Sequence, residues 1–409
     1  MSESIPRWAG DVVKHALSTR RIVHVAGARQ CGKTTLVEGL DLPGADRRTL
    51  DNPAIRMAAE SAPSEFVART GPGPMVIDEI QKVPDLLPAM KMKVDRDRSP
   101  GQYLVTGSTS LSANPNVRES LAGRMKTVRL RTLAQGEILR SKPGFIAGAF
   151  EGDFPKPRPG FHKREIIALA FRGGYPEALA LPEEERADWH RDYLDALLER
   201  DVRDVREIRK LPALRRLAVG LAARSSKFLD KAEFARALQM SKETVGTYVA
   251  ALEALHLFDQ VPPWTPGDYD RAVKSPKWFA ADSGTMAALL DWSREGVFFD
   301  PDQSGKLVET FAHHELAAEA DLSPRVRLWH YRDEDKREID FVLTDGDGRF
   351  LLVEVKAGSA VRGDDFKHID WFRAKFAPGA VGIVLHTGDA VLPFGSNRYA
   401  VPFGSLFGA

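Results

Sequence analysis

Hydrophobic and polar positions in the first 140 residues predict short buried strands separated by helices. Three apolar runs, 21–26, 74–78 and 102–106, each have the length of one strand, and each is followed by a glycine or an acidic residue. Continuous apolar runs of this kind are typical of strands buried on both faces, as in a parallel sheet with helical crossovers. We therefore expect the chain to begin with an α/β domain.

Helical periodicity replaces this pattern farther along the chain. Pro/Gly-rich segments within 141–160 indicate a boundary, and apolar residues at three- and four-residue steps predict helices over 161–210. Two further helices, at 231–238 and 242–254, flank a turn, and a strand at 256–261 follows them. This order of elements is typical of a winged helix-turn-helix.

The last third of the chain combines helices and strands. We expect 262–267, which is rich in proline, to be a linker, and 305–316 to be a helix. Two apolar runs, 337–343 and 350–356, flank the sequence Asp345-Gly346-Asp347-Gly348. Because Asp-Gly is a strong hairpin-turn signal, we expect these runs to pair as antiparallel strands in a mixed α/β domain.

Composition limits these expectations in only a few ways. A chain of 409 residues is too long for one core, so two to four domains are expected. The formal net charge of +1 gives no general argument for a nucleic-acid partner, and the single cysteine excludes an internal disulfide. Residues 1–7 lack a secretory signal and no apolar run is long enough to span a membrane, so we expect a cytoplasmic protein.

A phosphate-binding loop directly follows the first predicted strand. The residues that match G-x-x-x-x-G-K-[ST], with the threonine that follows, are Gly27, Ala28, Arg29, Gln30, Cys31, Gly32, Lys33, Thr34 and Thr35. Glycines let backbone N–H groups approach phosphates, lysine reaches the β- and γ-phosphates, and the threonine hydroxyl binds Mg²⁺. We therefore expect this loop to bind ATP together with Mg²⁺.

Polar residues at the ends of the other two strands complete the predicted ATP site. Asp78 is expected to hold Mg²⁺, and Glu79 to polarise the attacking water. Ser108 is expected to sense the γ-phosphate, with Thr106 as the second choice. A solvated acid is the alternative for Glu79, and a helix cap is the alternative for Ser108.

Two further residues near the loop suggest more specific hypotheses. Arg124 is a candidate for stabilising charge on the transferred phosphoryl group, in cis or in trans from a second copy of the chain. The alternative is an ordinary surface arginine. Cys31 lies inside the loop, so we expect alkylation of its thiol to block nucleotide binding, unless the residue is only a small neutral filler.

A second constellation of charged residues lies near the C-terminus. Asp340 lies on one strand of the predicted hairpin, and Glu354 and Lys356 lie on the other, with Glu309 on a helix upstream. Carboxylates that bind Mg²⁺ or Mn²⁺ beside a lysine are typical of metal-dependent phosphodiesterases. We therefore expect a second metal site at Glu309, Asp340 and Glu354. A hairpin with solvated charges, or a nuclease-like fold without activity, is the alternative.

These motifs together resemble those of a known family. The matching segments are Gly27–Leu36, Ile77-Asp78-Glu79-Ile80-Gln81, Thr106-Gly107-Ser108, Leu121-Ala122-Gly123-Arg124, Gly173-Gly174-Tyr175-Pro176 and Glu199-Arg200-Asp201-Val202. They are similar to those of bacterial and archaeal AAA-type P-loop ATPases with a C-terminal domain of uncharacterised function. That family is related to the signal-transduction ATPases with numerous domains. The resemblance covers nearly the whole chain.

The resemblance implies an α/β fold made of four parts. These are a P-loop ATPase core with a parallel sheet (1–140), a helical lid (141–210), a winged helix-turn-helix (211–264) and a mixed α/β restriction-endonuclease-like domain (265–409). It supports Lys33, Thr34, Asp78, Glu79 and Ser108 as the nucleotide site. It also supports Asp340, Glu354 and Lys356 as nuclease-like residues.

Three hypotheses for the function follow. The first is an ATP-driven switch whose nucleotide state positions a nuclease-like domain acting on DNA or RNA. The second is an ATP-dependent DNA-binding regulator with an inactive end domain, in which Lys242, Thr244, Thr247 and Tyr248 of the predicted recognition helix face a groove. The third is a switch for a protein partner, with an inactive end domain and a winged helix that serves only in packing.

Overall fold

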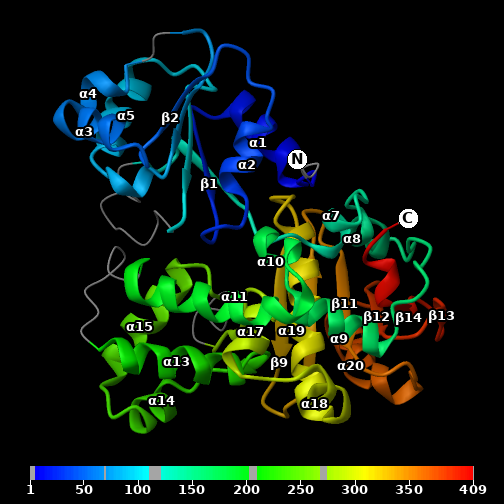
Figure 1. Ribbon diagram of the computed structural model, residues 1–409. Coiled ribbons are helices and arrows are strands. Elements are labelled where there is room, and N and C mark those ends of the chain that lie inside the picture. The colour runs from blue at the N-terminus through cyan, green and yellow to red at the C-terminus, as the bar shows by residue number, and fades with distance from the viewer. Residues whose placement is uncertain (1–4, 69–70, 110–120, 202–209, 268–273, 409) are drawn as a thin grey trace. The chain divides into compact units, whose positions relative to one another are not determined.

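The computed structural model of the protein describes residues 5–68, 71–109, 121–201, 210–267 and 274–408 (Figure 1). By its internal contacts the chain divides into two compact units. One comprises residues 1–132 with 254–256, and the other comprises residues 133–253 with 257–409.

The first unit is built on a five-stranded parallel sheet in the order β2-β3-β4-β1-β5. Its strands are β1 (Ile22–Ala26), β2 (Asp46–Thr49), β3 (Met75–Asp78), β4 (Tyr103–Gly107) and β5 (Met125–Arg129). The three strands expected from apolar runs, β1, β3 and β4, are confirmed. The other two escaped the pattern because they are edge strands that carry several charged residues.

Helices cover this sheet and complete its core. They are α1 (Ala9–Thr19), α2 (Lys33–Glu38), α3 (Pro53–Ser61), α4 (Pro63–Phe66) and α5 (Leu86–Arg96), with the 3₁₀ turn η1 (Ile80–Lys82) after β3. Leu86 and Met90 of α5 are fully buried against Tyr103 and Val105 of the sheet. Because β4 lies between β1 and β3, the segments that follow these three strands meet at one edge of the sheet.

The second unit begins with helices. They are α7 (Gln135–Ile138), α8 (Phe145–Phe150), α9 (Lys163–Arg172), α10 (Pro176–Ala180), α11 (Glu183–Ala196), the π-helical turn η3 (Leu197–Asp201), α13 (Leu211–Ala223), α14 (Lys231–Ala237) and α15 (Lys242–Ala254). An antiparallel sheet in the order β6-β8-β7 accompanies them, formed by β6 (Lys227–Phe228), β8 (Lys277–Ala280) and β7 (Phe258–Val261).

The helix α15 corrects one expectation about DNA contact. The spacing of its polar residues placed Tyr248 on a groove-facing surface. In the structure Tyr248 is buried, and its hydroxyl accepts a hydrogen bond from the backbone N–H of Lys210 at 3.3 Å. An aromatic ring with one polar end suits this position, because the ring fills the core while the hydroxyl finds a partner. Lys242 remains exposed.

A six-stranded mixed sheet completes the second unit, in the order β13-β14-β12-β11-β10-β9. Its strands are β9 (Arg327–Arg332), β10 (Glu338–Thr344), β11 (Phe350–Val355), β12 (Val381–His386), β13 (Leu392–Pro393) and β14 (Arg398–Pro402). The other elements are α17 (Ser283–Leu289), α18 (Arg294–Phe299), α19 (Pro301–Ala320), η4 (Gly363–Phe366), α20 (Lys367–Phe376) and η5 (Phe403–Ser405). The expected hairpin is confirmed, because β10 and β11 pair antiparallel.

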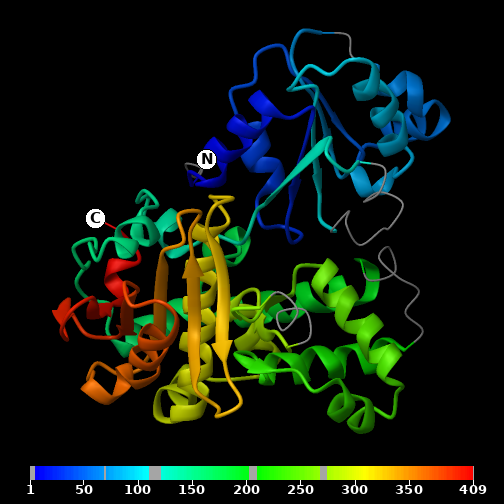
Figure 2. The same cartoon turned by 180° about the vertical axis from the view of Figure 1, so that it is seen from behind.

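The two faces of this sheet pack against different partners. Val342 and Leu352 belong to a cluster with Phe372 of α20, whereas Phe341 contacts Phe279 of β8, and α19 runs along the sheet (Figure 2). The pairing of β10 with β9 shifts register between Ile339 and Val342. Such a bulge re-aims side chains. It lets Asp340 and Phe341, although adjacent in sequence, both contact residues of β8.

The segment expected to be a linker has a packing role. Trp264 makes edge contacts with Phe372 and Phe376 of α20, at ring-centroid distances of 4.8 and 5.2 Å. Its backbone N–H donates to the carbonyl of His330 in β9 at 2.7 Å. The segment is therefore anchored to the C-terminal sheet.

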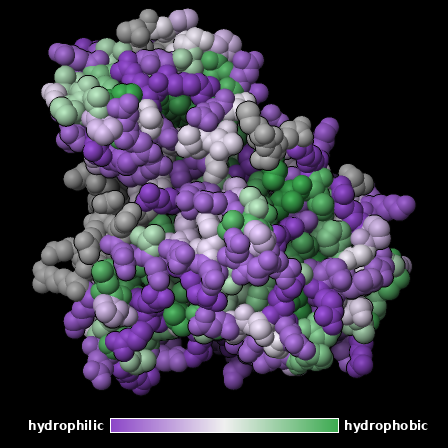
Figure 3. All heavy atoms as spheres, in the orientation of Figure 1, coloured by the Kyte–Doolittle hydropathy of each residue, from purple (hydrophilic) through white to green (hydrophobic). Residues whose placement is uncertain are grey.

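The described residues contain no helix that is both long and apolar enough to cross a membrane. Hydrophilic side chains dominate the visible face of the molecule, and hydrophobic ones form smaller groups among them (Figure 3).

Candidate ATP site and a C-terminal charge cluster

The phosphate-binding loop connects β1 to α2 in the first unit. Arg7 holds it in place, because one guanidinium nitrogen donates to the carbonyl of Cys31 at 2.8 Å and another to that of Arg131 at 2.7 Å. A Cβ at Gly27 would lie 2.1 Å from the carbonyl oxygen of Leu130, and Gly32 has a φ of 99°. Only glycine satisfies both positions, so the sequence pattern reflects the shape of the loop.

The lysine of the loop is held inside it. Lys33 is 4% exposed, and its Nζ donates to the carbonyls of Gly27 and Ala28 at 3.1 and 2.9 Å. By contrast, Thr34 and Thr35 are exposed. A buried ammonium group within a loop of backbone N–H groups fits a polyphosphate, because that ligand offers more negative charge than the two carbonyls.

A hydroxyl–carboxylate contact joins the loop to the neighbouring strands. The Thr34 hydroxyl lies 3.1 and 3.2 Å from the two carboxylate oxygens of Asp78, at the end of β3. The hydroxyl of Thr106, on β4, donates to the same carboxylate and accepts from the backbone N–H of Glu79 at 3.2 Å. A hydroxyl beside a fixed carboxylate is a donor set that suits Mg²⁺ bound with phosphates.

The next residue, Glu79, has an unusual backbone conformation and a fixed side chain. Its φ is 59°, in the left-handed region that non-glycine residues seldom adopt. The amide nitrogen of Gln81 donates to the Glu79 carboxylate and to the Ser108 hydroxyl, the latter at 2.9 Å. Gln81 therefore links the two residues predicted to act on the γ-phosphate. Its role could not be assigned from the sequence, since one glutamine after an acidic pair has no distinctive spacing.

A buried histidine lies beneath this edge of the sheet. His24 of β1 is 1% exposed, and within the described residues neither of its ring nitrogens has a hydrogen-bond partner. Burial, with a contribution from the nearby Lys33 charge, lowers the pKa of His24 to about 3. The ring is therefore neutral at physiological pH and adds no second positive charge near Lys33.

Arg124 lies away from these residues. It directly precedes β5, whose first residue pairs with the first residue of β1, whereas the phosphate loop follows the last residue of β1. Its guanidinium forms an ion pair with Asp95 of α5. The hypothesis that Arg124 senses the nucleotide bound to its own chain is therefore wrong, because the parallel sheet separates the two ends of β1. Action in trans stays a prediction.

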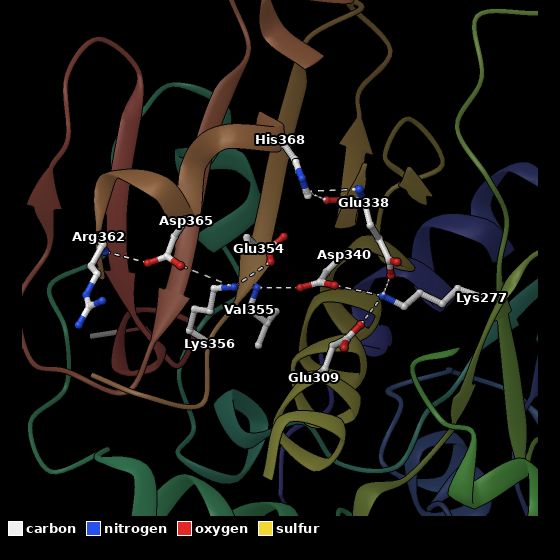
Figure 4. A network of polar contacts seen from close by, with 10 residues as sticks. All are labelled: Lys277, Glu309, Glu338, Asp340, Glu354, Val355, Lys356, Arg362, Asp365 and His368. Atoms are coloured by element: carbon white, nitrogen blue, oxygen red, sulfur yellow. Dashed lines mark hydrogen bonds and ion pairs between the residues drawn. The ribbon is translucent and has the colours of Figure 1, made fainter. Parts of the chain in front are cut away.

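The C-terminal carboxylates also come together, but around a residue that their spacing in the sequence does not indicate. Lys277 of β8 is fully buried, and its ammonium nitrogen lies 2.6 Å from Glu309, 2.8 Å from Glu338 and 3.1 Å from Asp340 (Figure 4). Glu309 comes from α19, and the other two acids come from β10. The site therefore combines three elements that are far apart in the sequence.

Glu354 and Lys356 lie on the other side of Asp340. The ammonium of Lys356 lies 3.1 Å from Glu354 and 3.7 Å from Asp365, and the second Asp340 oxygen accepts from the backbone N–H of Val355 at 2.9 Å (Figure 4). The expected proximity of Asp340, Glu354 and Lys356 is thus present.

The pKa values in this cluster reflect its crowding. Burial, reinforced by the Asp340 charge, raises the pKa of Glu309 to about 7 and that of Glu354 to about 8. Burial alone would lower the pKa of Lys277, but the carboxylates of Glu309, Asp340 and Glu338 raise it well above its ordinary value. Lys277 is therefore positively charged, and its ammonium group is the counterion of these carboxylates.

The described residues contain no group of three or more His, Cys, Asp and Glu side chains arranged to hold a metal ion. The expected metal site at Glu309, Asp340 and Glu354 therefore lacks support. Lys277 and Glu338 could not be assigned from the sequence, since Lys277 is a single lysine on a short strand distant from the acids.

Three family models match the chain. An AAA domain matches residues 19–139, a domain of unknown function (DUF8612) matches 163–296, and a second domain of unknown function (DUF4143) matches 304–406. The AAA domain implies ATP binding and hydrolysis by the first unit. The functions of the other two matched regions are not established.

Two curated relatives are similar to this chain along nearly its whole length. They are the uncharacterized proteins Mb2031c of Mycobacterium bovis and Rv2008c of Mycobacterium tuberculosis, each 30% identical over 405 residues, 97% of this chain and 83% of the relative.

Two solved structures show weak similarity. A Signal Transduction ATPase with Numerous Domains (STAND) protein with a tetratricopeptide repeat sensor, PH0952 from Pyrococcus horikoshii, is 12% identical with a TM-score of 0.23. The match covers 79% of this chain but only 46% of that protein. Protein VC1899 from Vibrio cholerae is 10% identical with a TM-score of 0.18, over 90% of this chain and 88% of that protein. Scores this low support no argument about fold or function.

The burial of Cys31 predicts an unreactive thiol. Cys31 is 0% exposed and its sulfur lies 3.5 Å from the carbonyl of Leu130. We expect Ellman's reagent to modify the folded protein at least about a hundred-fold more slowly than the denatured chain, because reaction requires local opening. Absorbance of the released thiolate measures both rates. Rapid modification of the folded protein would contradict this burial.

Proposed function

Since the chain belongs to the same family as Mb2031c and Rv2008c and contains an AAA domain, we propose that it is a Mg²⁺-dependent ATPase that works as a switch. The observation that carries this proposal is the meeting of Lys33, Asp78, Glu79 and Ser108 at one edge of the parallel sheet. Lys33 follows β1, Asp78 and Glu79 lie at the end of β3, and Ser108 follows β4.

Each residue has a role that follows from its chemistry. Lys33 and the backbone of residues 27–35 bind the phosphates. Thr34 and Asp78 hold Mg²⁺, which neutralises charge that develops on the phosphates. Glu79 accepts a proton from the attacking water. Ser108 senses the γ-phosphate through its hydroxyl, and its hydrogen bond from Gln81 supports this role.

Two substitutions separate binding from hydrolysis. We expect Lys33→Ala to weaken ATP binding about ten-fold or more, because a charge-assisted contact is lost. We expect Glu79→Gln to bind ATP as the wild type does, but to hydrolyse it about 100-fold more slowly or worse, because an amide cannot accept the proton. Calorimetric titration and phosphate release measure the two quantities.

The two predictions can be contradicted independently of each other. Unchanged binding by Lys33→Ala would exclude the loop as the nucleotide site. Unchanged hydrolysis by Glu79→Gln would exclude Glu79 as the base while leaving the site itself in place.

Gln81 is proposed as a positioning residue for the same reaction. Its amide fixes both Glu79 and Ser108, so we expect Gln81→Ala to lower kcat about ten-fold with little change in ATP affinity. Lys82→Ala is the matched control, since Lys82 pairs with Asp51 outside this network. An equal loss of kcat in both variants would mean that the turn η1 has only a structural role.

A metal-dependent nuclease is the second candidate activity, for the second unit. The proximity of Asp340, Glu354 and Lys356 favours it, and cleavage of DNA or RNA with Mg²⁺ or Mn²⁺, lost in Glu354→Ala, would support it. The contact of Lys277 with Asp340 and Glu309 opposes it. We therefore favour a switch whose second unit binds a partner, either a nucleic acid or a protein, without cutting it.

A further inference from the structure

The surroundings of Lys277 match the donor capacity of a lysine. An ammonium group has three N–H bonds and no acceptor, and the Nζ of Lys277 has three carboxylate neighbours within 3.1 Å. The side chain is 1% exposed, so water offers no substitute for any of these carboxylates. Removal of the ammonium would leave buried negative charges without their counterion.

The backbone keeps this lysine in place. Lys277 is the first residue of β8, the central strand of its sheet, and it pairs with Val261 on one side and Phe228 on the other. Two residues along β8, the ring of Phe279 stacks on His313 of α19, with centroids 4.3 Å apart and planes 10° apart. The ammonium is thus held by packing as well as by charge.

This position conflicts with a metal ion. Mg²⁺ takes oxygens at about 2.0–2.1 Å in near-octahedral geometry. Two of the three acids expected to bind the second metal, Glu309 and Asp340, are already within 3.1 Å of Lys277. A divalent ion on the same oxygens would lie close to a buried positive charge in a poorly screened environment. The residues therefore do not fit the metal that the resemblance to nucleases implies.

We propose that Lys277 is a built-in cation that takes the place of a divalent metal ion among Glu309, Glu338 and Asp340. The cluster then fastens the sheet β6-β8-β7 to α19 and β10, and it binds no Mg²⁺ or Mn²⁺ while the ammonium is present. Replacement of Lys277 by an uncharged side chain converts the same carboxylates into a divalent cation site. The proposal concerns the second unit alone, and so it does not depend on ATP hydrolysis by the first.

The test uses the full-length protein without nucleotide, and Mn²⁺ as the probe. Lys277→Met keeps most of the side-chain volume and removes the charge. Lys227→Met is the matched control, because exposed Lys227 on the adjacent strand β6 also acts on Glu309 through its charge, whereas Lys277 is the lysine in contact with the carboxylates. Electron paramagnetic resonance of free Mn²⁺ gives the number of bound ions, and thermal unfolding gives the stability.

We expect Lys277→Met to lower the unfolding midpoint and to bind one more Mn²⁺ than the wild type. Mn²⁺ should then raise the midpoint of this variant by ~5 °C, because a ligand that binds only the folded state stabilises it. The added site should disappear in the double variant Lys277→Met/Asp340→Asn. Lys227→Met should behave as the wild type does. A folded Lys277→Met protein that gains no Mn²⁺ site would overturn the proposal.

A second experiment tests the proposal even if Lys277→Met does not fold. Glu354 belongs to the predicted metal set but is not one of the three carboxylates around Lys277, so Glu354→Gln tests for a metal without removing a partner of that lysine. We expect wild type and Glu354→Gln to give identical Mn²⁺ titrations. Mn²⁺ binding by the wild type that is lost in Glu354→Gln would overturn the proposal.

Discussion

The parallel pairing of β4 with both β1 and β3 is the interaction on which the ATP site depends. Each strand contributes only one or two polar residues at its end, and none of these segments could form the site alone. The register sets Ala26 of β1 against Gly107 of β4, and Ile77 of β3 against Val105 of β4. The residues that follow these strands therefore emerge at one edge, within hydrogen-bonding distance of each other.

The network at this edge can report the state of the nucleotide. Gln81 joins Glu79 to Ser108, and Thr106 joins Asp78 to the backbone of Glu79. A change at the γ-phosphate would therefore reach Glu79, the proposed base, and Asp78, the proposed metal ligand, through a short chain of hydrogen bonds. Glu79, in a left-handed conformation at the start of η1, lies where such a change could alter the turn.

The second unit also contains a cluster of charged side chains, but this cluster joins elements of the fold instead of binding a ligand. Four acidic side chains, those of Glu309, Glu338, Asp340 and Glu354, lie around two ammonium groups, those of Lys277 and Lys356. The raised pKa of Glu354, about 8, leaves that side chain largely protonated at neutral pH. Two lysines carry the formal charge of one divalent ion, but they are tethered to their strands. The cluster therefore holds elements together, whereas a metal centre would also present an open coordination position to a substrate.

The sequence predicted the parts of the molecule whose patterns are local. Buried strands, the phosphate loop and the Asp-Gly hairpin each have a signal within a few residues, and the structure contains all three elements. The edge strands β2 and β5 were missed because their charged residues hide the apolar pattern. Tyr248 was misplaced because its burial depends on contacts outside its own helix, among them the hydrogen bond from the backbone N–H of Lys210.

The spacing of residues in the sequence could not predict roles that depend on partners far away in the chain. Lys277 meets Glu309, 32 positions away, and Asp340, 63 positions away, only because β8 packs against α19 and β10. Arg124 was assigned by its motif, and its separation from the loop follows from the direction of β1 and β5. Such relations depend on three-dimensional topology, which residue patterns do not contain.

Mg²⁺-dependent ATP hydrolysis by Thr34→Val beside the wild type tests the ATPase most directly. Valine keeps the shape of threonine and removes the hydroxyl that lies 3.1 Å from Asp78. We expect the wild type to hydrolyse ATP only with Mg²⁺, and Thr34→Val to bind ATP with an affinity that no longer responds to Mg²⁺ and to release almost no phosphate. Equal Mg²⁺-dependent hydrolysis by both proteins, or none by the wild type, would contradict a Mg²⁺-dependent ATPase at this loop.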